Sequence, residues 1–260
     1  MAYQPDHELV QEHLQWLRCF DLQHKSNWEK ILLNDPEAAA CEASVRRVLQ
    51  ENGNTVEPYE QISPDFICTR GGEQFFVEVT CIRIASASEK TGLPHPCDPK
   101  SFAETRWIGG LNESIYFEAK NKASKCARLG KPVIVAVGTF HWMASNYSID
   151  RKYLDLLLTG TTYIASDISP STGGPIGESY LSTKLEHAAF LRAKENSLMH
   201  PALKPVSGIL VCGFGGVPPI LRCVLHPDPI HVFDRSYLPQ VECCRLKSSY
   251  HGGKMATEWV

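Results

Sequence analysis

The chain has 260 residues, of which 43% are hydrophobic and 21% are charged, and its formal net charge is -3. This length and composition are typical of a globular protein with a substantial core. The mildly acidic balance excludes a generally basic surface, so binding of a polyanion must rely on a local patch. The N-terminus carries early acids, and no window approaches about 18 uninterrupted apolar residues, so we expect neither a signal peptide nor a membrane span. Ten scattered cysteines then predict reduced thiols in a cytoplasmic protein.

The N-terminal part of the chain is predicted to be helical. Apolar residues recur at helical spacing over residues 7–33. A second helix begins in the sequence NDPE, with Asp35 as its N-cap and Pro36 at its first position, and it ends at Gly53. This helix carries Glu37, Glu42, Arg46 and Arg47.

A hairpin with two acidic residues follows this helix. Strands are expected at 55–60, 64–69 and 74–84, and Gly71-Gly72 suits a two-residue turn because both central residues can take positive φ. Counting outward from the turn places Asp65 opposite Glu78. Opposed Cβ atoms lie about 4.5–5.5 Å apart, and like charges there repel. The acids therefore either share a divalent cation, Mg²⁺ or Mn²⁺, or form a solvated hairpin end.

The rest of the chain predicts one α/β domain, a mixed sheet flanked by helices. A loop over 85–110 precedes a helix at 111–129, and the apolar run 131–140 is typical of a central strand covered on both faces. Residues 146–204 read as helix, loop and helix, residues 206–214 and 220–226 form a strand pair, and the tail after 245 is expected to be disordered. The predicted organisation has three parts: an N-terminal helical extension (1–34), a core (35–145) and a C-terminal elaboration packed on the same domain (146–260).

Residues 35–140 resemble the PD-(D/E)xK nuclease superfamily, which has the restriction-endonuclease-like fold. That family has a helix with a glutamate, a hairpin with Pro-Asp and then Glu-x-Lys, and a following helix and strand. Here Glu42 or Glu37 corresponds to the glutamate of the preceding helix. Pro64-Asp65 opens the hairpin, and Glu78-Val79-Thr80 closes it. The resemblance implies an endonuclease or exonuclease that hydrolyses phosphodiester bonds of nucleic acid, with DNA favoured and no membrane partner. It is compatible with a homodimer.

Thr80 departs from the family pattern, because it stands where the family has lysine. That lysine orients the attacking water and offsets charge on the phosphate. Some relatives supply it from the next helix, which here carries Lys120, Lys122 and Lys125. Lys120 and Lys122 flank the apolar stripe of that helix, and Lys122 is the first choice. The alternative is that all three are solvated helix charges.

The resemblance implies a complete set of site residues. The expected metal ligands are Asp65, Glu78 and the Val79 carbonyl, and Glu42 assists directly or through a water. The Thr80 hydroxyl is expected to point into the site. The expected nucleic-acid-binding residues are Arg46, Arg47, Lys120, Lys125 and Arg128.

Two other functions are compatible with the sequence. The missing Glu-x-Lys lysine and the acidic net charge favour a catalytically inactive member of this fold that acts as a binding or assembly module. A metal-dependent hydrolase of small phosphoesters would instead need a closed pocket.

Overall fold

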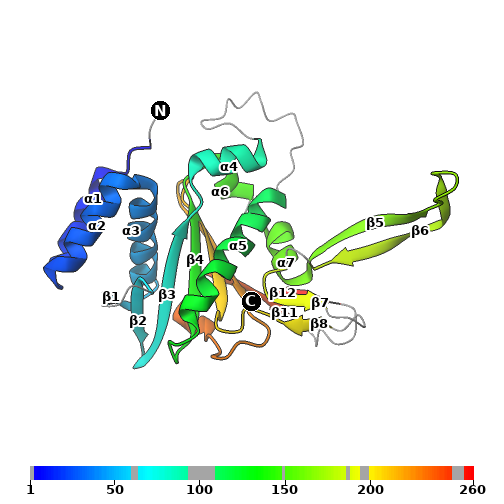
Figure 1. Ribbon diagram of the computed structural model, residues 1–260. Coiled ribbons are helices and arrows are strands. Elements are labelled where there is room, and N and C mark those ends of the chain that lie inside the picture. The colour runs from blue at the N-terminus through cyan, green and yellow to red at the C-terminus, as the bar shows by residue number, and fades with distance from the viewer. Residues whose placement is uncertain are drawn as a thin grey trace.

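A central mixed sheet with helices on both faces dominates the architecture (Figure 1). The computed structural model describes residues 3–59, 64–92, 109–147, 150–185, 188–193, 199–247 and 255–260. The sheet has eight strands in the order β1-β2-β3-β4-β9-β10-β11-β12. The predicted α/β class, a mixed sheet flanked by helices, is thus confirmed. None of the helices in these ranges is long and apolar enough to cross a membrane.

Three helices form the N-terminal part: α1 (His7–Leu17), α2 (Leu22–Asn34) and α3 (Pro36–Glu51). Residues 7–33 are helical, as predicted, in two separate helices, because Asp21 begins a new helix by accepting a hydrogen bond from the Gln23 N–H at 2.7 Å. The start of α3 is as predicted. Asp35 is its N-cap, accepting from the Ala38 N–H at 3.2 Å, and Pro36 is its first residue.

The hairpin has the predicted register. It consists of β2 (Phe66–Arg70) and β3 (Glu73–Cys81), with β1 (Thr55–Pro58) antiparallel to β2. Gly71 and Gly72 have φ of 58° and 87°, the positive values that this turn requires. The ladder pairs Arg70 with Glu73 and Phe66 with Val77. Because the local turn fixes the register, it also fixes which side chains of the two strands share a face.

The remaining strands of the sheet come from the second half of the chain. Strand β4 (Val133–Thr139) is parallel to β3 and to β9 (Gly208–Gly213), and all its residues are buried, as predicted for a central strand. The predicted late strand pair is confirmed, because β9 is antiparallel to β10 (Ile220–Leu225). Strands β11 (Glu242–Leu246) and β12 (Thr257–Trp259) complete the sheet. Residues 257–259 are thus a strand, whereas residues 248–254 of the tail predicted to be disordered lie outside the described residues.

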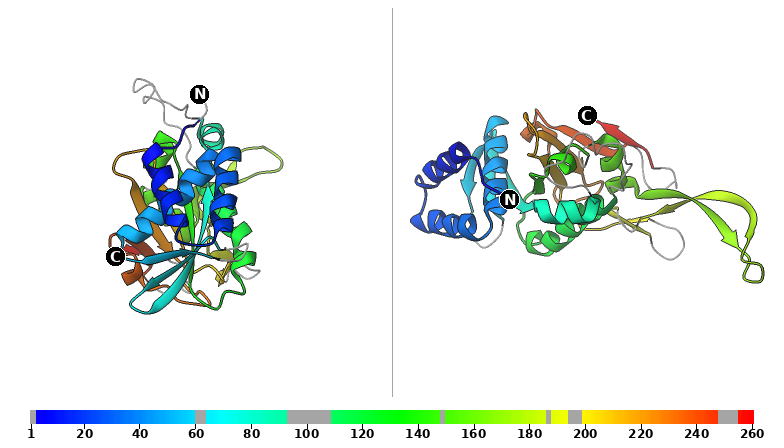
Figure 2. Two further views of the ribbon diagram at one scale, coloured as in Figure 1. Left: turned by 90° about the vertical axis from the view of Figure 1, so that its left-hand side faces the viewer. Right: turned by 90° about the horizontal axis from the view of Figure 1, so that it is seen from above.

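The helices that follow the hairpin in the chain are α4 (Ile84–Thr91), α5 (Gly109–Cys126), α6 (Trp142–Tyr147) and α7 (Arg151–Thr159). The predicted loop over 85–110 is therefore wrong for the residues of α4, and residues 93–108 lie outside the described part. For residues 146–204 we predicted a helix, a loop and a second helix. The first helix corresponds to α7, but strands follow it in place of the predicted second helix. A hairpin of β5 (Thr161–Ile168) and β6 (Pro175–Lys184) projects from the body (Figures 1 and 2), and β7 (Leu191–Ala193) pairs with β8 (Met199–Pro201).

The core consists of two apolar layers, one on each face of the sheet. On one face, β3 and β4 pack against α3, with Val77 and Ile134 against Val45. On the other face, Val135 of β4 packs against α5 and α7, with Ile115 and Leu157 in the same cluster. Successive residues of β3 and β4 thus face opposite layers. Glu78, which follows Val77, therefore faces α5.

Candidate functional site

Two carboxyl groups meet at the end of the hairpin. Glu78 lies in the middle of β3 and is only 2% exposed. Asp65 precedes β2 and continues its ladder, because its N–H donates to the Val77 carbonyl at 3.1 Å. The Asp65 carboxylate accepts from the Val79 N–H at 2.6 Å. This bond fixes the side chain of Asp65 against β3, beside Glu78.

The Val79 carbonyl faces the same edge of β3. In an extended strand, the N–H and C=O of one residue point to the same side. The Val79 N–H points toward Asp65, so the Val79 carbonyl also lies on the Asp65 side. The structure therefore brings together the three oxygen donors expected from the sequence.

Lys122 reaches these acids from α5. Its Nζ lies 2.5 Å from the Glu78 Oε1, and its side chain is 20% exposed. Burial lowers the pKa of Lys122, but the hydrogen bond and charge of Glu78 outweigh this effect, and the net pKa is raised. Lys122 therefore stays protonated. Small buried residues on both sides, Ala119 and Ala123, let α5 lie close to the sheet.

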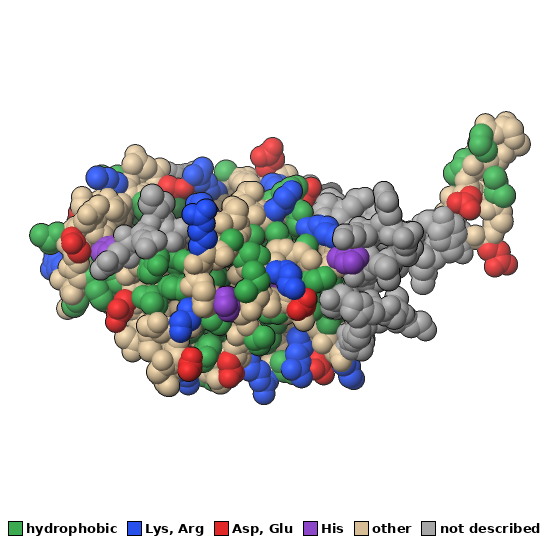
Figure 3. All heavy atoms as spheres, turned by 60° about the horizontal axis from the view of Figure 1, so that its bottom comes forward, with side chains coloured by type: hydrophobic (Ala, Val, Ile, Leu, Met, Phe, Trp, Pro, Cys, Tyr) green, Lys and Arg blue, Asp and Glu red, His purple; other side chains and the backbone are tan. Residues whose placement is uncertain are grey.

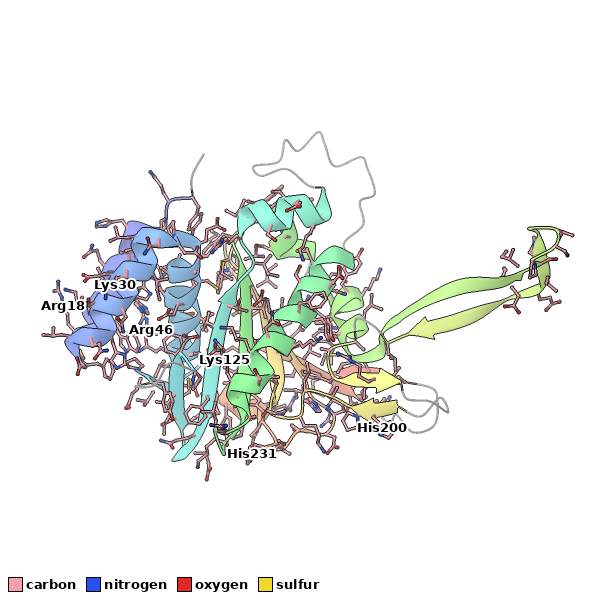
Figure 4. All side chains as sticks on the ribbon, viewed as in Figure 1. Arg18, Lys30, Arg46, Lys125, His200 and His231 are labelled. Carbon is pink, nitrogen blue, oxygen red and sulfur yellow. The ribbon has the colours of Figure 1, made fainter. Side chains whose placement is uncertain are left out.

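The other two lysines of α5 lie differently. Both Lys120 and Lys125 are exposed. The positive charge of Lys125 lowers the pKa of Asp65, so it acts on the acidic cluster from the side of α5 near β3 (Figure 4). Lys122 is the lysine that pairs with a site carboxylate, and Arg128 is exposed just after α5.

Glu42 adds a third carboxyl group from α3. Burial raises its pKa well above the usual range, and the negative charges of Asp65 and Glu78 raise it further. Burial and Glu78 likewise raise the pKa of Asp65 to about 7, although the Val79 N–H and Lys122 oppose the shift. These mutual effects show that the three acids lie within electrostatic range. Glu37, the other candidate on α3, instead accepts from the Ile84 N–H at 2.6 Å at the start of α4.

Thr80 is held by an acid that the sequence did not single out. Its hydroxyl donates to the Glu118 Oε2 at 2.8 Å. Glu118 lies on α5 four residues before Lys122, and residues at this spacing share one helix face. The four-residue spacing between Glu118 and Lys122 is the feature of the sequence from which Glu118 could have been predicted. The helix face toward β3 thus presents the carboxylate of Glu118 to Thr80 and the ammonium group of Lys122 to Glu78.

Arg46 departs from the expected phosphate-facing patch. It is 2% exposed, and its guanidinium donates to His13 Nδ1 at 3.2 Å, to Gln50, and to Glu12 at 2.5 Å (Figure 4). Arg47 also donates to Glu12, at 2.5 Å. Burial of Arg46 between α1 and α3 therefore makes it an interior residue that ties the two helices together. On the molecular face in Figure 3, basic and acidic side chains are interspersed.

The oxygen donors suit a hard divalent cation. Mg²⁺ is typically held by one or two carboxylates and keeps several waters, a requirement that Asp65, Glu78 and the Val79 carbonyl meet. Burial, and next the negative charge of the neighbouring acids, raise the pKa values of Glu42 and Asp65, and a bound cation would offset that charge. Among the described residues, no group of three or more His, Cys, Asp or Glu side chains is placed to hold a metal ion.

Comparison of the chain with protein families, with characterised proteins and with solved structures gives no match in any of the three. A functional interpretation must therefore start from the residues of the site. Glu42, Asp65, Glu78 and Lys122 come from α3, the hairpin and α5, and they meet at one end of β3.

Proposed function

We propose that the chain is a metal-dependent nuclease of the PD-(D/E)xK type, with a restriction-endonuclease-like core, that hydrolyses phosphodiester bonds of nucleic acid, DNA in the first place. The observation that carries the proposal is the ion pair between Lys122 and Glu78. Lys122 supplies, from α5, the lysine that Thr80 does not provide. The order of α3, acidic hairpin, α5 and β4, with α4 between the hairpin and α5, supports the same function.

Each site residue has a role in this chemistry. Asp65, Glu78 and the Val79 carbonyl would hold Mg²⁺ or Mn²⁺, which when bound lowers the pKa of a coordinated water and neutralises charge on the phosphate. The Lys122 ammonium has three donors, with which it orients the attacking water and offsets charge that develops on the phosphate. Glu42 assists directly or through a water.

The substrate backbone would be bound next to this site by exposed cations. Lys120, Lys125 and Arg128 lie on α5 and the turn after it. Such contacts bind phosphates without reading the base sequence, and they weaken as salt rises. Arg46 has no part in this contact, because its guanidinium is used inside the protein.

A cleavage assay with matched variants tests the proposal. The purified chain is incubated with Mg²⁺ or Mn²⁺ and plasmid, linear, single-stranded DNA and RNA substrates. We expect metal-dependent cleavage that Asp65→Asn abolishes and that Lys122→Ala lowers by about 10²–10³-fold, the usual loss on removing a group that stabilises developing charge. Lys30→Ala, at an exposed lysine of α2 that has no role in the proposed site, controls for loss of one positive charge. Cleavage unchanged by Asp65→Asn would contradict the proposal.

The rival function is an inactive member of the fold that serves as a binding or assembly module. The observation in its favour is that Lys122 already pairs with Glu78 at 2.5 Å, which satisfies a buried carboxylate without a metal. This function predicts no cleavage of any substrate. It also predicts that Mg²⁺ raises the melting temperature of the wild type no more than that of Asp65→Asn.

A further inference from the structure

We infer that His13 of α1 is a positioning residue for Glu42, so that the N-terminal helices complete the site; the inference rests on the proposed nuclease function. His13 is fully buried, and its ring lies between Trp16 and Trp28, with ring centroids 5.0 and 4.5 Å away. Its Nε2 has no hydrogen-bond partner among the residues that the structure describes, and it lies 3.9 Å from the Glu42 Oε1.

The hydrogen bond on the other ring nitrogen fixes where the proton sits. The Arg46 Nε–H donates to His13 Nδ1 at 3.2 Å, so Nδ1 must carry a lone pair. Glu12 and Gln50 hold the rest of the Arg46 guanidinium in place. A neutral imidazole has a single N–H, which therefore lies on Nε2 and faces Glu42.

His13 acts as a neutral donor and not as a charge. Burial, and next the positive charge of Arg46, lower its pKa to about 3, so the ring is uncharged at neutral pH. Buried donors are nearly always paired, which makes the free Nε2–H an exception that needs a reason. A hydrogen bond to oxygen needs about 2.7–3.2 Å, so a displacement of the Glu42 carboxylate by roughly 1 Å would complete one.

This bond would act on the group in the cluster that most needs support. Glu42 is pushed toward its neutral form by burial and by Asp65 and Glu78. A hydrogen bond to the ionised carboxylate favours that form and fixes its orientation. Partners of this kind, behind a catalytic group, set its position without touching the substrate. The chain Arg46–His13–Glu42 thus connects the packing of α1 on α3 to the site.

Kinetics of paired substitutions separate positioning from packing. His13→Asn keeps an amide near the Nδ1 position but cannot reach Glu42, whereas His13→Gln places an amide near the Nε2 position. We expect His13→Asn to lower kcat by about 10- to 100-fold with KM unchanged, and His13→Gln to recover most of it. Combined with Glu42→Gln, His13→Asn should cause no further loss, because both act through one group. His7→Asn, exposed on the same helix, should leave kcat unchanged. Additive losses, or no recovery by glutamine, would overturn the inference.

A spectroscopic measurement tests the contact without any cleavage. The ¹⁵N imidazole spectrum of the full chain should show His13 as the Nε2-protonated tautomer, and its Nε2–H signal should shift in Glu42→Gln. A shift in a chain that cleaves no substrate would keep the contact and reject the nuclease. An unchanged signal, or the Nδ1-protonated tautomer, would reject the inference whether or not the chain is a nuclease.

Discussion

At the scale of single residues, Glu42, Asp65 and Glu78 crowd one end of β3 with Lys122 as the paired cation. Like charges in a buried place oppose folding, and such arrangements persist where function needs them. The raised pKa of Asp65 makes this cost measurable. Removing an acid from the cluster should therefore stabilise the fold while it damages the proposed activity.

Asp65→Asn should stabilise the chain more at pH 8 than at pH 5. The folded pKa of Asp65, about 7, lies above the ordinary value of about 3.9. Between these values the folded state binds more protons than the unfolded state, so the free energy of unfolding falls as pH rises from about 4 to 7. Asparagine removes this loss and can still accept from the Val79 N–H. Urea unfolding in metal-free buffer should show a gain on the order of 1–2 kcal/mol at pH 8.

The control for this measurement is Glu57→Gln, an exposed carboxyl group on β1. It should change the free energy of unfolding by less than about 0.5 kcal/mol at either pH. If Asp65→Asn were less stable than the wild type at pH 8, the acids would not repel one another as the pKa of Asp65 indicates.

At the scale of elements, local signals were predictable and distant ones were not. The Gly71-Gly72 turn and the Asp35 cap act over a few residues, so the hairpin register and the start of α3 follow from the sequence. Placement of Asp65 beside Glu78 followed from that register. Lys120 and Lys122 were both candidates because they flank the apolar stripe of α5, and Lys122 was the first choice.

Elements and contacts that depend on partners far along the chain were missed. The hairpin of β5 and β6 is local and was missed for a different reason, because the turn-rich segment 169–174 between the strands reads as a loop between helices. His13 lies 29 positions before Glu42, and no spacing rule connects the two. The burial of Arg46 depends likewise on α1, which supplies Glu12 as its partner.

Helix α3 carries Glu42. The close packing of α3 on β4 depends on Gly138. A Cβ at Gly138 would lie 2.4 Å from the Cys41 Sγ and 2.9 Å from the Phe214 ring. Gly138→Ala should therefore push α3 off the sheet and lower the free energy of unfolding by about 1–3 kcal/mol, as overpacking of a core does. Urea unfolding measures this loss. Gly174→Ala is the matched control, because its nearest neighbour would be the Thr172 Oγ1 at 3.7 Å. An equal effect of both substitutions would contradict the close approach.

At the scale of the whole molecule, the last strand, β12, forms the edge of the sheet opposite β1 and stabilises that edge through side-chain contacts. The Asp155 Oδ1, on α7, accepts from Thr257 Oγ1 at 3.0 Å, Trp259 Nε1 at 3.1 Å and Cys244 Sγ at 3.3 Å. The guanidinium groups of two arginines also lie over the Trp259 ring, at 5.3 and 5.6 Å from its centroid: Arg151 and Arg222. One carboxylate on α7 thus joins this helix to β11 and β12, which lie 89 to 104 residues further along the chain.

Asp155→Ala should loosen this end of the sheet and leave the candidate site intact. Three donors would lose their acceptor, so we expect the free energy of unfolding to fall by about 2–4 kcal/mol. The control is Glu258→Ala on β12, which breaks only the exposed ion pair with Arg245. It should lower the free energy of unfolding by less than about 1 kcal/mol. Hydrogen exchange should show faster exchange of the β12 amides in Asp155→Ala, with β3 still protected. In the strand order, β3 and β12 are separated by β4, β9, β10 and β11. Loss of protection at β3 and β12 together would contradict the prediction, because the sheet would then unfold as one unit.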